Sequence, residues 1–148
     1  MNLKMKYNLT ESTWGEEEIE AIKNVVESGN YTMGERVKEF EIKFANFFKS
    51  KYAVMVNSGS SANLIGIAAL FFKKLNPILP GDEVIVPAVS WSTSYSPLQQ
   101  YGLKLKFVDI DLLTLNYDIE KLEKAITSKT RVILAVNLLG NPNDFKKI

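Results

Sequence analysis

Small polar residues lie where a short apolar run gives way to an apolar helical stretch. The sequence there reads Asn-Ser-Gly-Ser-Ser over residues 57–61, and it includes Gly59 and Ser60. Unpaired backbone N–H groups at a helix start, the positive end of the helix dipole and serine hydroxyls can together bind a phosphate. A serine at such a junction also commonly does no more than cap the helix, and spacing alone favours this cap. Neither GxxxxGK[ST] nor GxGxxG occurs at this turn, which argues against a P-loop NTPase and an ordinary dinucleotide fold.

Two further groups of residues follow expected strands. Trp91 stands between Ser90 and Ser92, and an indole among small hydroxyl residues can stack on a flat heteroaromatic ring. It can equally pack beneath a loop or at a subunit contact, and both interpretations remain open. Asp109 and Asp111 end another strand, where two carboxylates usually cap the chain and stay solvated. We therefore assign no metal site to them.

The composition excludes several kinds of chemistry. The 148 residues contain 18 Lys and Arg, 17 Asp and Glu, no His and no Cys, for a net charge of +1. A nearly neutral chain provides no basic surface for nucleic acid or an anionic membrane. Without Cys and His, these residues form no disulfide, thiolate nucleophile, Cys/His metal site or Ser-His-Asp triad. We expect no nucleic-acid, membrane or metal partner.

No segment predicts membrane insertion or export. The longest apolar run, Leu64 to Phe72, is interrupted by Gly66 and is far shorter than the roughly 20 residues that span a bilayer. Residues 1–13 lack the apolar core of a signal peptide. We expect a cytoplasmic protein with a core of its own.

Helical and strand patterns alternate along the chain. Alternation of this kind implies right-handed crossovers and a parallel sheet, with ligands bound outside the carboxyl ends of the strands. The predicted helices cover residues 16–28, 35–48, 60–73, 93–101 and 119–126. The predicted strands cover residues 52–56, 83–86, 105–109 and 131–136.

The first two helices carry more specific signals. Thr13 and Glu16 have the spacing of a capping box, and Gly29 is expected to end the first helix. Apolar residues of the second helix form one stripe that we expect to lie in the core; they are Val37, Phe40, Phe44, Phe47 and Phe48. The loop over residues 30–34 is, from spacing alone, a plain helix connector.

Five segments occur together and in order. They are Thr32–Glu35, Asn57–Leu64, Val86–Thr93, Phe107–Asp111 and Asn137–Pro142. Jointly they resemble the DegT/DnrJ/EryC1/StrS family of pyridoxal-phosphate enzymes of nucleotide-sugar biosynthesis, from about Tyr7 to the end of the chain. The resemblance implies an α/β fold, the N-terminal part of the large domain of the aspartate-aminotransferase-like (fold type I) fold. Its N-terminal helices would cover about residues 13–50, and a mainly parallel sheet flanked by helices would cover about residues 51–148.

Carried over residue by residue, the resemblance implies a cofactor site. It makes Gly59 and Ser60 ligands of the cofactor phosphate, and Trp91 the residue that stacks on the pyridine ring. The cofactor would be pyridoxal 5'-phosphate or pyridoxamine 5'-phosphate. The resemblance also implies a position near the sugar nucleotide for the residues Tyr31, Thr32, Met33 and Gly34.

The run Ser90 to Tyr101 resembles the 3-dehydratase branch of the family, which serves deoxysugar and lipopolysaccharide biosynthesis, including the colitose pathway. This implies removal of the C3 hydroxyl of a nucleotide-activated 4-keto-6-deoxysugar, with glutamate as amino donor, by a homodimer. In that branch a histidine replaces the Schiff-base lysine of the aminotransferases, and this chain has no histidine. We therefore expect an N-terminal fragment that carries no catalytic residue and is inactive alone.

Two other functions remain open at this stage. One is a 4-ketosugar aminotransferase that uses the same cofactor and has the Schiff-base lysine in place of the histidine. The other is a non-catalytic α/β module that binds phosphate or forms a dimer.

Overall fold

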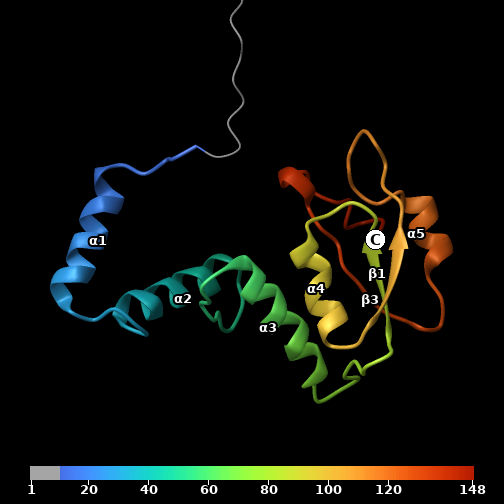
Figure 1. Cartoon of the computed structure of the whole chain (residues 1–148), viewed down its shortest axis with the longest axis horizontal. Coiled ribbons are helices and arrows are strands. Elements are labelled where there is room, and N and C mark those ends of the chain that lie inside the picture. The colour runs from blue at the N-terminus through green and yellow to red at the C-terminus, as the bar shows by residue number, and fades with distance from the viewer. Residues whose placement is uncertain (1–10) are drawn as a thin grey trace, which may run out of the picture. The chain divides into compact units, whose positions relative to one another are not determined.

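The computed structural model describes residues 11–148 and divides into two compact units (Figure 1). The first unit ends at Met55 and contains helices α1 (Glu16–Ser28) and α2 (Glu35–Phe47). The second unit runs from Val56 to Ile148. Its elements are α3 (Gly59–Phe71), β1 (Glu83–Pro87), α4 (Ser92–Gln100), β2 (Lys104–Val108), α5 (Ile119–Ala125), β3 (Thr130–Ile133) and the 3₁₀ turn η1 (Leu138–Gly140).

Helix α1 begins differently from the prediction. Gly15 is the N-cap, and its backbone N–H donates to the Glu18 carboxylate at 2.7 Å. The expected capping box of Thr13 and Glu16 is therefore wrong, because the first helical turn starts after Gly15 and uses a glutamate two positions later. Gly29 ends the helix as predicted, with a left-handed φ of 65° that suits glycine.

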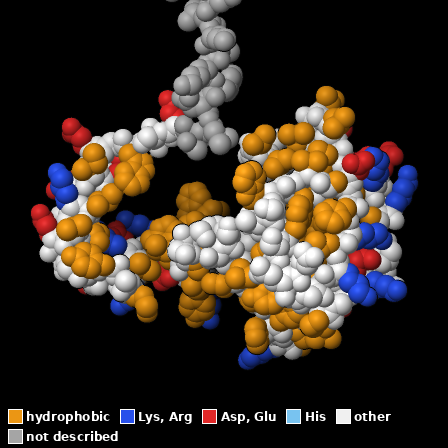
Figure 2. All heavy atoms as spheres, in the orientation of Figure 1, with side chains coloured by type: hydrophobic (Ala, Val, Ile, Leu, Met, Phe, Trp, Pro, Cys, Tyr) orange, Lys and Arg blue, Asp and Glu red, His pale blue; other side chains and the backbone are white. Residues whose placement is uncertain are grey.

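The aromatic stripe of α2 is not a core within its unit. Phe44 stacks between Phe40 and Phe48, with ring centroids 5.4 and 4.6 Å apart, yet all three rings are exposed. Phe47 is exposed as well, and Ala45 is the one buried residue of the helix. The prediction of a buried stripe is wrong for the described residues, because neither α1 nor the rest of this unit covers these rings. Hydrophobic side chains accordingly show at the surface of this unit (Figure 2).

The predicted strand over residues 52–56 is also absent. This segment pairs with no other strand of the described chain, and Tyr52, Val54 and Met55 are exposed. The Met55 N–H donates to the Glu41 carboxylate at 2.8 Å. A β-rich sequence forms a strand only where a neighbouring backbone completes its hydrogen bonds, and the carboxylate satisfies this N–H instead.

The second unit is built on a three-stranded parallel sheet in the order β2-β1-β3. This confirms the predicted parallel sheet and three of its strands, with ends that shift by at most three residues. Both faces of the central strand are covered. Val84 and Val86 pack against Leu98 of α4 on one face, while Ile85 packs with Leu122 of α5 on the other. Figure 1 shows α4 and α5 on opposite sides of β1.

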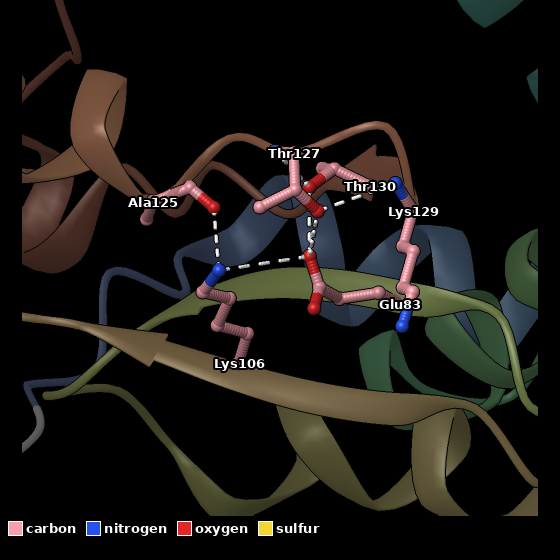
Figure 3. A network of polar contacts seen from close by, with 6 residues as sticks. All are labelled: Glu83, Lys106, Ala125, Thr127, Lys129 and Thr130. Atoms are coloured by element: carbon pink, nitrogen blue, oxygen red, sulfur yellow. Dashed lines mark hydrogen bonds and ion pairs between the residues drawn. The ribbon is translucent and has the colours of Figure 1, made fainter.

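A polar network secures the amino end of this sheet (Figure 3). The Glu83 carboxylate at the start of β1 accepts hydrogen bonds from Thr130 Oγ1 at 2.8 Å and Thr127 Oγ1 at 3.3 Å. Lys106 lies 3.9 Å from the same carboxylate and donates to the Ala125 carbonyl, at the end of α5, at 2.7 Å. Among residues 11–148, no helix is long and apolar enough to cross a membrane.

Candidate functional site

The turn before α3 forms a helix N-terminus with two unused donors. Ser58 is the N-cap: its hydroxyl accepts from the Ser61 N–H at 3.2 Å and its carbonyl accepts from the Ala62 N–H at 3.0 Å. The predicted serine cap is thus confirmed, and of Ser58 and Ser60 it is Ser58 that caps the helix. Gly59 and Ser60 follow as the first two helical residues, and their N–H groups donate to no described residue. These two groups are available to an anion, where the helix dipole favours negative charge.

The surroundings of this turn fit a phosphate. A Cβ placed on Gly59 would meet no other residue's atoms within 4 Å, so no neighbouring side chain crowds that side of the first turn. The Ser61 hydroxyl donates to Asn57 Oδ1 at 2.6 Å, which holds the turn in shape without using the N–H groups of Gly59 and Ser60. The geometry therefore leaves both the donors and the room that a phosphate requires.

Trp91 is the N-cap of α4 and lies four residues after the end of β1. Its side chain is 74% exposed, and its carbonyl accepts from the Ser94 N–H at 2.9 Å. The indole is therefore not packed beneath a loop of the described residues, whereas packing at a subunit contact stays open beside stacking on a ligand. An exposed, flat ring at the carboxyl end of a central strand suits stacking on a heteroaromatic ligand.

The first turns of α3 and α4 lie side by side. Asn63 Nδ2 of α3 is 3.5 Å from the Thr93 carbonyl of α4, a long hydrogen bond. A cavity of about 200 Å³ lies between the two helices, and its lining includes Ser60 and Ser96. The structure thus brings the start of α3, with Ser60, to the start of α4, which follows Trp91.

The segment Tyr31–Gly34 belongs to the first unit. Tyr31, Met33 and Gly34 line a cavity of about 510 Å³ there, while Thr32 is exposed. Gly34 caps α2, and a Cβ on it would lie only 3.0 Å from Asn30 Nδ2, so a larger residue would require the Asn30 side chain to shift. The position of these four residues near a sugar nucleotide stays a prediction.

The two aspartates serve local structure. Asp109 pairs with Lys121 at 2.9 Å, and this hydrogen bond lowers the pKa of the carboxyl. Asp111 accepts from the N–H groups of Thr114 and Leu113 at 2.8 and 3.0 Å, and the Thr114 contact is the main cause of its lowered pKa. Asp111 therefore caps a turn and stays solvated as predicted, whereas Asp109 stays solvated in an ion pair and caps no backbone N–H of the described residues. No cluster of three or more metal-ligating side chains occurs among residues 11–148.

Sequence reasoning missed two tyrosines that fasten the carboxyl edge of the sheet. Tyr95 donates its hydroxyl to the Pro87 carbonyl at 2.6 Å, and Tyr117 donates to the Leu134 carbonyl at 2.8 Å. Burial raises the pKa of both phenols. Their apolar rings fit ordinary core patterns, so the sequence contains no signal that identifies their hydroxyls as ties to the backbone.

Several known proteins are similar to this chain in sequence and in fold. The model of the DegT/DnrJ/EryC1/StrS aminotransferase family matches residues 12–148. The GDP-4-keto-6-deoxy-D-mannose 3-dehydratase of Yersinia pseudotuberculosis is 61% identical over 146 residues, which are 99% of this chain and 37% of that protein.

Two solved structures of GDP-4-keto-6-deoxymannose-3-dehydratase are equally similar. Both have a TM-score of 0.91 and 61% identity, over 96% of this chain and 37% of theirs. One holds a trapped PLP–glutamate geminal diamine, and the other, a mutant, holds GDP-perosamine. This chain therefore spans about 37% of the length of the relatives it matches. Because the family model covers nearly all of its residues, the chain belongs to the DegT/DnrJ/EryC1/StrS aminotransferase family.

Proposed function

We propose that this protein is a pyridoxal-phosphate- and pyridoxamine-phosphate-dependent 3-dehydratase that acts on a GDP-linked 4-keto-6-deoxyhexose. The observation that carries this proposal is the 61% identity to a dehydratase of that specificity over 146 residues, a span that includes the starts of α3 and α4. The product would be a 3-deoxy ketosugar for deoxysugar and lipopolysaccharide synthesis, with colitose as the end product. Because the chain matches 37% of the relatives' length, activity, substrates and partners are all part of the proposal.

The residues of this chain would bind and orient the cofactor. The N–H groups of Gly59 and Ser60 would donate to its phosphate, with the α3 dipole adding favourable electrostatic energy. Trp91 would stack on its pyridine ring and fix the plane of that ring. When bound, pyridoxamine phosphate supplies an amine that condenses with the 4-keto group and a ring that accepts electrons as the C3 hydroxyl leaves.

The dehydratase is favoured over the aminotransferase by the activity of the most similar relatives reported above. The GDP group is supported by the relative that holds GDP-perosamine, and glutamate by the relative that holds the PLP–glutamate adduct. We also propose a cytoplasmic homodimer, with Tyr31, Thr32, Met33 and Gly34 near the sugar nucleotide. The 148 residues contain no histidine, so their part in the reaction is binding rather than imidazole acid–base catalysis.

Binding of pyridoxamine phosphate to the chain tests the cofactor site. This form has no aldehyde, so it does not react with surface lysines as pyridoxal phosphate does. The chain has two tryptophans, and Trp14→Phe makes Trp91 the single fluorophore. We expect saturable quenching of Trp91 fluorescence, weakened by Ser60→Pro, which removes a backbone N–H. Quenching that does not saturate, or that Ser60→Pro leaves unchanged, would contradict the site.

A chimaera tests the substrate. The matching N-terminal part of the Yersinia pseudotuberculosis dehydratase would be replaced by this chain and assayed with a GDP-linked 4-keto-6-deoxymannose, glutamate and pyridoxal phosphate. We expect the 3-deoxy ketosugar, ammonia and the 2-oxoglutarate formed from glutamate as products, and loss of activity with Trp91→Ala. A folded chimaera that binds the cofactor but leaves this sugar unconverted would argue against the proposed substrate.

A further inference from the structure

Trp91 lies in a turn that we define as residues 88–94, which includes the first three residues of α4. Backbone hydrogen bonds hold this turn at both ends. At its start, the Ala88 N–H donates to the Val108 carbonyl of β2 at 2.7 Å. At its end, the Ser94 N–H donates to the carbonyl of Trp91 itself at 2.9 Å. The indole in the middle of this turn has a largely exposed side chain, so its direction depends on the backbone of the turn.

Tyr95 closes the same turn from within α4. Its hydroxyl donates to the Pro87 carbonyl at 2.6 Å, which joins the residue just before the turn to the residue just after it. The ring packs edge-on against Phe107 of β2, with centroids 5.5 Å apart and an interplanar angle of 72°. The ring therefore stays in place without the hydroxyl, and the hydroxyl is the part that reaches the end of β1.

We propose that Tyr95 is a positioning residue that holds Trp91 in the orientation needed to stack on a cofactor ring. This inference rests on the proposed function. A ring that is already oriented loses less conformational freedom when a ligand stacks on it, so the ligand binds more tightly. Removal of the phenolic oxygen would leave the Pro87 carbonyl without this donor and would release the turn between Pro87 and Tyr95.

The remainder of α4 has a separate anchor. Pro97 and Leu98 are buried, and Leu98 packs on Val84 and Val86 in the core. Loss of the Tyr95 hydroxyl should therefore affect the turn more than the helix. This separates a positioning role from a general contribution to stability.

In a Trp14→Phe background, the fluorescence anisotropy of Trp91 measures how freely the indole in this turn moves. We expect Tyr95→Phe to lower the fluorescence anisotropy of Trp91 in the absence of any ligand. We also expect it to weaken pyridoxamine phosphate binding about two- to tenfold, with unchanged circular dichroism. Tyr101→Phe is the matched control at the other end of α4: its ring packs on Phe71 at 5.4 Å, and its hydroxyl bonds to no described residue.

The outcomes distinguish this inference from the proposed function. Unchanged Trp91 anisotropy in Tyr95→Phe, with or without a lower melting temperature, overturns the positioning role. If Tyr95→Phe has lower anisotropy but the parent chain does not bind pyridoxamine phosphate, the positioning role of Tyr95 is supported. That result would contradict the proposed function instead. Should Tyr95→Phe fail to fold, Ser90→Ala decides the question, because it removes the 3.2 Å hydroxyl contact between Ser90 and Ser94 inside the same turn. The bond from Tyr95 to Pro87 is intact in that variant, so Trp91 anisotropy should stay unchanged, and a drop overturns the inference.

Discussion

The Tyr117 hydroxyl donates a hydrogen bond to the Leu134 carbonyl oxygen at 2.8 Å, inside the carboxyl edge of the sheet. The same hydroxyl lies 3.3 Å from the Ile85 carbonyl of β1. Leu134 directly follows β3, and its own N–H donates to the Ile85 carbonyl at 2.9 Å. One buried phenol thus bridges neighbouring strands close to the point where their pairing ends.

We predict that Tyr117→Phe lowers the free energy of unfolding by about 1–2 kcal/mol, because the part-buried Leu134 carbonyl loses this donor while the ring still fills its site. Urea denaturation followed by circular dichroism measures this difference. Tyr101→Phe is the control, and an equal loss in both variants would contradict the prediction.

The same phenol predicts a loss of stability at alkaline pH. Burial raises the pKa of Tyr117 above its ordinary value of 10.0. Above that value the unfolded chain releases the proton while the folded chain keeps it. The contribution of Tyr117 is therefore fully present below pH 10 and is lost as the pH rises toward the raised pKa. Unfolding free energies measured from pH 8 upward should fall less steeply in Tyr117→Phe, and parallel curves would refute this.

Gly59→Pro tests the backbone donor at the start of α3. Proline is well tolerated at the first helical position, and the extended ψ of 160° at Ser58 suits a following proline. We predict an intact helix and at least about tenfold weaker binding of pyridoxamine phosphate, because an N–H donor to a charged group is removed. Gly59→Ala keeps the N–H, and its Cβ meets no protein atom within 4 Å, so it should bind more tightly than Gly59→Pro. Equal affinities in the two variants would exclude the Gly59 N–H as a ligand.

Thr130→Val tests the network at the amino end of the sheet. The Thr130 hydroxyl donates to Glu83 at 2.8 Å and accepts from the Thr127 N–H at 3.0 Å. We predict that the nearly isosteric valine lowers the free energy of unfolding by about 1–2 kcal/mol. Thr127→Val, which removes a longer bond of 3.3 Å to the same carboxylate, should cost less. A larger effect at Thr127, measured by urea denaturation, would show that the network is organised differently.

The lowered pKa of Asp111 predicts a loss of stability in acid. The backbone N–H of Thr114 is the main cause of its lowered pKa, relative to an ordinary value of 3.8. The contribution of this carboxylate is present above pH 3.8 and is lost as the pH falls through the lower folded value. Carboxyl ¹³C shifts in an NMR titration should place the Asp111 midpoint below 3.8. A midpoint at or above the ordinary value would contradict the turn geometry.

The sequence predicted the second unit better than the first. The helices and strands that the sequence pattern predicts over residues 83–133 pack against one another within the described chain, so the predicted and observed elements agree. Residues 52–56 have the sequence pattern of a strand, but no strand of their own unit pairs with them. The phenylalanines of α2 have the pattern of a core stripe, but their unit has no side chains that bury them. A local sequence pattern does not show whether such a partner is present.

The candidate site divides in a similar way. Ser58 as a cap and the position of Gly59 and Ser60 at a helix start could be predicted, because both depend on residues next to each other in sequence. The contact between Asn63 and Thr93 and the bond from Tyr95 to Pro87 could not, because each depends on side-chain direction within the folded unit.

The sparse burial in the first unit bears on the order of folding during translation. Helices α1 and α2 have 13 residues each and a single buried side chain, Ala45. Isolated helices of this length are marginal in water, and most helical stability comes from tertiary packing. These two helices are synthesised before β1, the strand that contains the buried residues Val84, Ile85 and Val86. Of the two units, the earlier one thus has less buried surface to stabilise it, and we expect structure to consolidate from the later unit backward, against the direction of synthesis.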